Sequence, residues 1–203
     1  MIEVKIDKDQ INRVQNALSS MQSQTPNVLK KAINETAKQA RKELAEKAKQ
    51  NYALKTSGFN SSMRIKNATV GKLQADIITK GEALEIGKFK ASPFRYTTGK
   101  NRPSYIKAKV LSQSQMKALV KSGVKAFVAR FRNGHVAVAQ RVPGKVMESN
   151  PKKTFLKKLL SPSIPQMIGN ETKVYGEVEP KIQTLLQENI QRELIRTMGG
   201  GKG

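Results

Sequence analysis

Residues 126–141 read AFVARFRNGHVAVAQR, and this stretch decides the fold class because it carries the clearest hairpin signal in the chain. Asn133-Gly134 lies between two runs in which apolar and polar residues alternate, and an Asn-Gly pair adopts the positive φ angles that a tight two-residue turn requires. Phe127 and Phe131 fall on one face of the first run, so we expect that face to point into the core. The stretch therefore predicts two antiparallel strands.

Two long helices are predicted on either side of this hairpin. Thr25-Pro26 is a strong helix start, because threonine caps the first turn and proline fits its first position. The residues from there to about Tyr52 contain no Gly or further Pro and are rich in Ala, Lys, Glu and Gln, which predicts a helix about 40 Å long. A second helix is expected from about Glu177 to Thr197, with Pro180 in its first turn.

Together these signals indicate an α+β fold with an antiparallel β-sheet of about four or five strands. The long N-terminal helix is expected to pack across the sheet, with the C-terminal helix beside it. Short strands are also expected at Ile2–Ile6, around a Gly71-Lys72 turn and at 105–110, and a helical turn or two at Gln113–Lys121. One core should hold Leu29, Ile33, Ala40, Leu44, Phe127, Phe131, Val136 and Val138.

We expect a single α+β domain over residues 1–198, followed by a disordered Gly-rich tail at 199–203. Residues 88–104 are polar and basic and contain two prolines and a glycine, which is typical of a long exposed loop. We therefore expect a basic loop insertion at about 88–104 within that domain.

The positive charge of the chain is concentrated in one segment. The net charge is +23, and residues 88–158 alone hold 18 Lys and Arg against a single acid, Glu148. A segment that repels itself this strongly needs a counter-charge, which DNA, RNA, an acidic protein or anionic lipid could supply. The alternative is a solvated face that only keeps the protein in solution.

The candidate contact surface for DNA or an acidic partner combines the basic loop with cations of the hairpin. Aromatic residues make up only 5% of the chain, so any nucleic acid should be held by its phosphate backbone without sequence preference. The candidate residues are Lys88, Lys90, Arg95, Lys100, Arg102, Lys107, Lys109, Arg130, Arg132, Arg141 and Lys145.

Site chemistry is sparse elsewhere in the sequence. The chain has no cysteine and one histidine, His135, so no zinc site is expected, and neither a metal nor a cofactor is assigned. Phosphate-binding loops, dinucleotide-binding motifs and nucleophile elbows are absent, so we expect no enzyme activity and no catalytic residues. No apolar run approaches the roughly 20 residues that span a bilayer, and none reads as a secretory signal, so we expect assembly in a cytoplasm.

Residues 126–168 carry a pattern that resembles the minor tail protein Z family of phages and prophages. The pattern joins the Asn133-Gly134 hairpin to a Gln140-Arg141-Val142 step and then to Pro-Ser-Ile-Pro-Gln-Met at 162–167, its most specific piece. Ser161 stands where the family pattern leads us to expect glycine. The order of elements also matches, and the resemblance covers about residues 8–196.

This resemblance implies a structural, non-enzymatic component of the virion that completes the tail of a long-tailed phage. It implies a place at the head-proximal end, where head and tail join. The implied partners are the tail tube, tail terminator or neck proteins, with the tape measure protein and the end of the genome DNA as further possibilities. A homo-oligomeric ring of six or three copies is expected, and the competing interpretation is a free nucleic-acid-binding protein without sequence preference.

Overall fold

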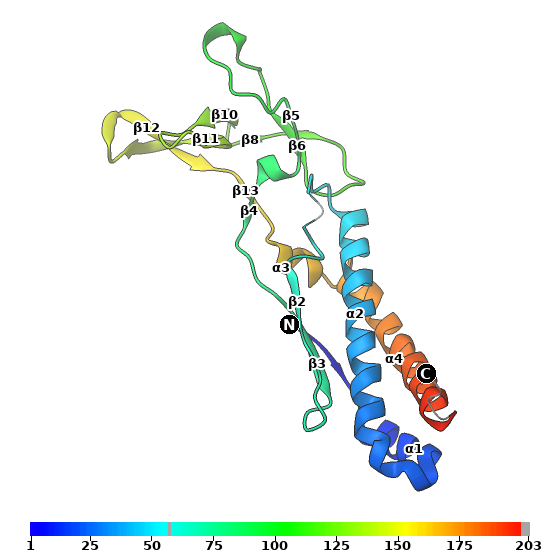
Figure 1. Ribbon diagram of the computed structural model, residues 1–203. Coiled ribbons are helices and arrows are strands. Elements are labelled where there is room, and N and C mark those ends of the chain that lie inside the picture. The colour runs from blue at the N-terminus through cyan, green and yellow to red at the C-terminus, as the bar shows by residue number, and fades with distance from the viewer. Residues whose placement is uncertain (57, 200–203) are drawn as a thin grey trace. The chain divides into compact units, whose positions relative to one another are not determined.

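A computed structural model describes residues 1–56 and 58–199, with helices and antiparallel strands in an α+β arrangement (Figure 1). The chain forms two compact units. The helical unit comprises Met1–Ala48, Gly58–Gly81 and Pro165–Gly203, and the strand unit comprises Lys49–Ser57 and Glu82–Ile164. The Gly-rich tail predicted at 199–203 lies, apart from Gly199, outside the described residues. The single domain expected over 1–198 stays a prediction, to be tested by whether the two units unfold together.

The helix predicted from Thr25 begins at that residue, but Thr25 does not cap it, because its backbone is already helical and its buried hydroxyl has no hydrogen-bond partner among the described residues. At the start of α1 (Lys8–Leu18), the Asp7 side chain accepts a hydrogen bond from the Gln10 backbone amide at 2.7 Å, and the Gln10 side-chain oxygen accepts one from the Asp7 backbone amide at 3.1 Å. A 3₁₀ turn, η1 (Ser19–Gln24), leads into α2 (Thr25–Asn51). The C-terminal helix α4 (Tyr175–Met198) follows the short α3 (Ile164–Ile168) and begins two residues earlier than expected.

The sheet of the helical unit has three antiparallel strands in the order β1-β3-β2, and α2 packs across it (Figure 1). The strands are β1 (Ile2–Lys5), β2 (Met63–Lys66) and β3 (Gln74–Thr79). Beyond β2, the side chain of Asn34 in α2 accepts a hydrogen bond from the amide of Ala68 at 2.7 Å and donates one to its carbonyl at 3.1 Å. The Asn34 side chain thereby satisfies the backbone N–H and C=O groups of Ala68, which take no part in a strand ladder.

The strand unit is built from several small antiparallel sheets. The predicted hairpin is confirmed as β10 (Phe127–Arg130) and β11 (Val136–Met147), with Gly134 at φ +81° in the turn. β12 (Asn150–Lys158) pairs with β11. The remaining elements are β4 (Leu84–Glu85) with β13 (Leu160–Ser161), β5 (Lys90–Ser92) with β6 (Lys107–Lys109) and β7 (Lys117–Ala118), β8 (Val120–Lys121) with β9 (Val124–Lys125), and the 3₁₀ turns η2 (Ile86–Lys88) and η3 (Gly99–Asn101).

The prediction of one shared core is wrong. Leu29, Ile33, Ala40 and Leu44 are fully buried in the helical unit, while the strand unit has its own core cluster. That cluster uses Val128 and Val138, whereas Phe127 and Phe131 are only half-buried. Alternation along β10 defines two faces; Val128 on one face joins this cluster, and Ala129 on the Phe127 face is buried as well. The cluster consists of Ile86, Ala91, Ile106, Ala108, Ala126, Val128 and Val138, with Val136 partly buried against it.

Two local expectations also differ from the structure. Residues 113–121 contain β7 and β8 in place of a helical turn, because those strands pair with β6 and β9. The basic stretch 88–104 starts with η2 and β5, so the part without α-helix or strand is 93–106. β11 also continues through Pro143, because the ladder to β12 shifts register between Arg141 and Val146 and leaves that stretch unpaired.

Candidate anion-binding surface

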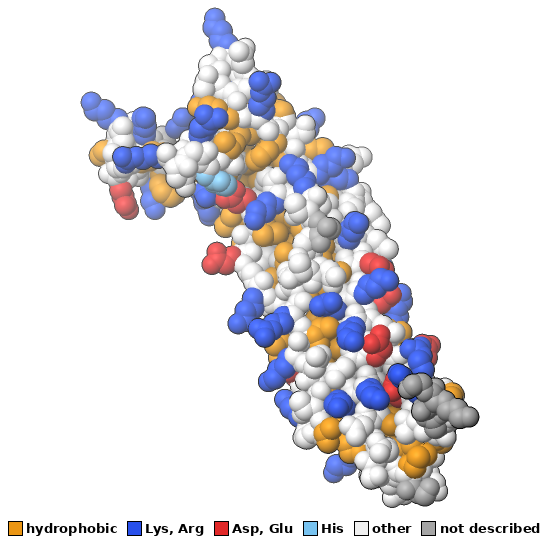
Figure 2. All heavy atoms as spheres, in the orientation of Figure 1, with side chains coloured by type: hydrophobic (Ala, Val, Ile, Leu, Met, Phe, Trp, Pro, Cys, Tyr) orange, Lys and Arg blue, Asp and Glu red, His pale blue; other side chains and the backbone are white. Residues whose placement is uncertain are grey.

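The charge separates between the two units. The strand unit contains 20 Lys and Arg against three acids, a net charge of +17, whereas the helical unit contains 18 against 12 and has a net charge of +6. Figure 2 shows Lys and Arg side chains at many places on the face in view, and fewer Asp and Glu side chains. The strand unit is therefore the part of the chain that needs an external counter-charge.

All eleven candidate residues lie in the strand unit. Ten of them are exposed, and Lys109 is half-buried because its ammonium donates to the carbonyl oxygen of Ser112. Lys88 ends η2, Lys90 is in β5, and Lys107 and Lys109 are in β6. The others are Arg95, Lys100 and Arg102 in the 93–106 stretch, Arg130 in β10, Arg132 in the hairpin turn, and Arg141 and Lys145 in β11. Their common role in binding stays a prediction.

The β5-β6 pair shows how the fold holds like charges on one face. Lys90 lies directly opposite Lys109, and Ala91 lies opposite Ala108. Both alanines belong to the core cluster, so alternation sends the lysines to the outer face. Directly opposed like charges destabilise a sheet, which makes this face a place where a bound anion would relieve repulsion.

Aromatic rings support several of the candidate cations. The guanidinium groups of Arg102 and Arg141 each lie 5.6 Å from the centre of the Phe127 ring. Arg130 lies 5.0 Å from the Tyr96 ring, and Lys145 lies 4.7 Å from the Phe155 ring. A ring face attracts a cation without neutralising it, so these groups are oriented while their charge stays available to an anion.

Sequence reasoning missed the lysines of β12 as part of this surface. Lys152, Lys153 and Lys157 are exposed on β12, which pairs with the strand that carries Arg141. They were counted in the charge of residues 88–158, but Pro151 concealed the strand that places them. Residues 152–158 read KKTFLKK, which has no alternation of apolar and polar residues, so the sequence carried no clear strand signal here.

One acid of the strand unit is shared between two basic side chains. The Glu85 carboxylate lies 2.9 Å from Nε2 of His135 and 3.0 Å from Nζ of Lys158. Burial raises the pKa of the Glu85 carboxyl, but the hydrogen bonds from His135 and Lys158 outweigh it, so the net pKa is lowered. These two contacts connect β4 to His135 near the hairpin turn and to Lys158 in β12.

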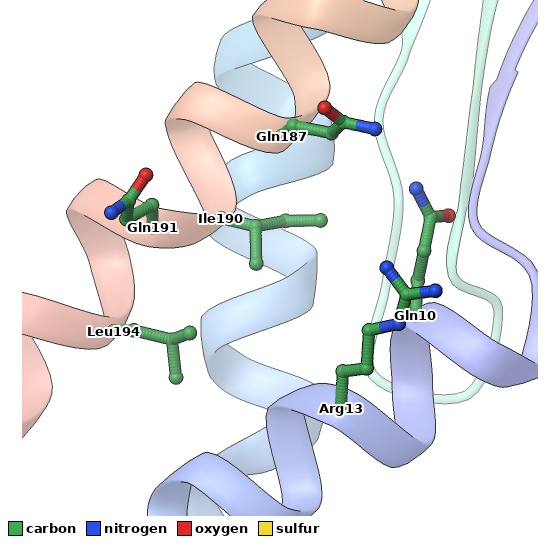
Figure 3. A pocket seen from close by; sticks show the side chains of 6 residues that line it. All are labelled: Gln10, Arg13, Gln187, Ile190, Gln191 and Leu194. Atoms are coloured by element: carbon green, nitrogen blue, oxygen red, sulfur yellow. The ribbon is translucent and has the colours of Figure 1, made fainter.

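A groove of about 260 Å³ in the helical unit lies between α1 and α4 (Figure 3). Gln10 and Arg13 come from α1, and Ile190 and Leu194 come from α4. Amide groups of Gln187 and Gln191 complete the lining, which holds no carboxylate or nucleophile. The groove therefore offers no constellation for acid–base or nucleophilic chemistry.

Within residues 1–56 and 58–199, no three His, Asp or Glu side chains are grouped so that they could hold a metal ion. Across the same ranges, every helix is too short or too polar to cross a bilayer.

Comparison with known proteins gives one match. The family model described as prophage minor tail protein Z (GPZ) matches residues 10–199. No curated protein and no solved structure matches the chain.

Proposed function

Because the chain belongs to the prophage minor tail protein Z family, we propose that it is the tail completion protein of a long-tailed phage, placed at the head-proximal end of the tail and needed for head–tail joining. The match from residue 10 to residue 199 carries the proposal, since it includes both units. Family membership supports a structural role in the virion tail and suggests a protein that is not an enzyme. The finer placement at the head-proximal end is our inference.

The partners in this proposal are other components of the tail and neck. They are the tail tube, tail terminator or neck proteins, together with the tape measure protein or the genome end. Six or three copies would form a ring that follows the symmetry of a tail tube. The charge of the strand unit supports the proposal, since +17 in one compact unit favours an anionic neighbour such as a DNA backbone or an acidic protein.

The direct test is deletion of the gene from an inducible prophage. We expect wild-type particles to contain the protein by mass spectrometry. We expect the deletion lysate to contain filled heads and full-length tails that electron microscopy shows unjoined, with joining restored by added purified protein. Joined, infectious particles from the deletion strain would contradict the proposed function. A virion reconstruction that shows a single asymmetric copy would contradict the ring.

The candidate surface is tested by the combined substitution of Arg95, Lys100 and Arg102 by alanine. All three are exposed and none is in the core cluster, so the variant should fold. If the surface meets DNA, the variant should enter the particle but hold the genome end poorly. If it meets an acidic tail protein, the variant should be missing from the tail. Fully infectious particles would leave the charge with no role beyond solubility.

A second candidate function is free nucleic-acid binding without sequence preference, which the 20 cations and three acids of the strand unit favour. Binding should then weaken steeply with salt, with log K falling by about 0.9 for each phosphate neutralised per unit of log salt. The triple substitution should lower that slope by up to about three. Absence of the protein from purified virions, with this salt dependence, would favour the second candidate over the first.

A further inference from the structure

The outer part of the β11-β12 hairpin has no third strand. β10 pairs with β11 only over Val136–Ala139. Of these four β11 residues, only Ala139 also has a partner in β12, which is Lys158. Residues 142–155 are here called the distal ribbon; within the described structure their strand pairing is limited to Val146 with Thr154 and Met147 with Asn150, and 142–145 are unpaired. A two-stranded ribbon is marginally stable in water, so this segment stands to gain order from a partner.

The distal ribbon combines apolar and cationic side chains. Val146 is 53% exposed, although it lies within a strand. A pocket of about 360 Å³ is lined by Met147, Glu148, Ser149 and Phe155 of the ribbon together with Phe131 and Leu156, and Val146 is not among its lining residues. Four of those six side chains are apolar. An apolar pocket at the outer end of a ribbon has the character of an interface core.

The charges around the pocket indicate which partner it fits. The ribbon carries Lys145, Lys152 and Lys153 against one acid, Glu148, and within the described residues none of these lysines forms an ion pair. Lys145 lies 4.7 Å from the ring centre of Phe155, a pocket residue, so its charge is held at the pocket. One cation held at the apolar opening and two more on the same ribbon match an acidic protein surface that presents an apolar side chain.

Nucleic acid and a second copy of this chain fit less well. A phosphate backbone is bound by cations alone and gives no use to an apolar pocket or to Val146. A second strand unit would bring another net charge of +17 against the ribbon.

We propose that the distal ribbon is a docking arm, which lies against an acidic surface of a different protein in the same particle and receives one apolar side chain of that protein in the pocket. The proposal rests on the proposed function for the existence of the particle. It names the class of partner that this end of the molecule takes, which the proposed function leaves open between DNA and protein.

Photo-crosslinking in assembled particles tests the arm. Val146 is replaced by benzoyl-phenylalanine, which needs no buried space because the position is exposed. Irradiation should yield one dominant adduct with a virion protein of net negative charge. An adduct with DNA, an adduct with a second copy of this chain, or no adduct would overturn the proposal. Absence of the unmodified protein from particles would instead remove the proposed function and the arm with it.

A matched pair of phenylalanine variants separates docking from folding. Phe155→Ala removes a pocket wall that faces Lys145, whereas Phe94→Ala removes a ring that faces Lys55 at the same 4.7 Å distance elsewhere in the strand unit. In the crosslinking strain, Phe155→Ala should lower the adduct yield on the order of tenfold, as expected for an interface anchor, and Phe94→Ala should leave it unchanged. Equal yields from the two variants would overturn the role of the pocket, and hydrogen exchange of the purified proteins reports whether each is folded.

Discussion

The helical unit and the strand unit differ in how they are held together. In the helical unit, one long helix face packs on another helix and on a sheet, and cations are balanced by nearby acids such as Glu43 with Lys181 and Glu177 with Lys47. In the strand unit, short strands surround the longer β11-β12 pair, and several cations lie over aromatic rings without an acid beside them. Most of the excess positive charge therefore lies in the strand unit, which is the part that we propose meets a partner.

The largest loss of stability should come from a cavity-forming substitution in the core of the helical unit. Leu29 is fully buried on α2, so Leu29→Ala should lower the free energy of unfolding by about 2–5 kcal/mol. Chemical denaturation followed by circular dichroism measures it, and one shared transition for both units would support a single cooperative domain.

The counterpart in the strand unit is Phe127→Ala. Its ring is half-buried between two guanidinium groups, so the loss should stay below about 2 kcal/mol. If Phe127→Ala lowers the free energy of unfolding as much as Leu29→Ala or more, Phe127 is a core residue, as the sequence predicted.

The next effect concerns the polar contact inside the helical core. Asn189 of α4 is buried and donates to Thr36 Oγ1 at 2.9 Å and to Gln39 Oε1 at 2.8 Å in α2. Asn189→Ala removes both hydrogen bonds and should cost about 1–3 kcal/mol in denaturant unfolding. Thr184→Ala, on the exposed side of the same helix, is the matched control and should change stability by less than about 0.5 kcal/mol.

Salt should affect the two units differently. Screening relieves repulsion among unbalanced cations, which is about 1 kcal/mol for a pair 4 Å apart in water, over a Debye length of about 10 Å at 0.1 M. Raising sodium chloride should therefore slow amide hydrogen exchange in the strand unit, by a total on the order of 1 kcal/mol. Exchange in the helical unit should change little, and equal protection of both units would refute the charge contrast.

The smallest effect should be the pH dependence at Glu85. The lowered pKa of its carboxyl means that the contacts with His135 and Lys158 stabilise the fold at pH values above the ordinary pKa of 4.5, and that this stabilisation is lost as the pH falls through the lowered value. Glu85→Gln should lower the melting temperature at pH 6 and converge with wild type at strongly acidic pH. A difference that persists at acidic pH would assign the effect to packing.

The sequence predicted the local elements of this fold well. Thr25-Pro26 and Asn133-Gly134 are local signals read within a few residues, and the structure confirms the helix that begins at Thr25 and the hairpin around Asn133-Gly134. The sequence also showed which segment carries the positive charge, because Lys and Arg residues can be counted without knowing the fold. The exposure of ten of the eleven candidate cations agrees with that count, although their ligand stays a prediction.

What the sequence by itself determined is therefore the set of elements, their order and the location of the charge. The tertiary structure alone decided which residues of β10 join the core cluster, that the apolar residues divide between two units, and that Arg102 meets Phe127. Alternation defines two faces of a strand but does not say which one is covered, since that depends on neighbours such as Ile86 and Ile106 that are distant in the chain. The continuation of β11 past Pro143 has the same cause, because the register shift against β12 exists only once both strands are paired.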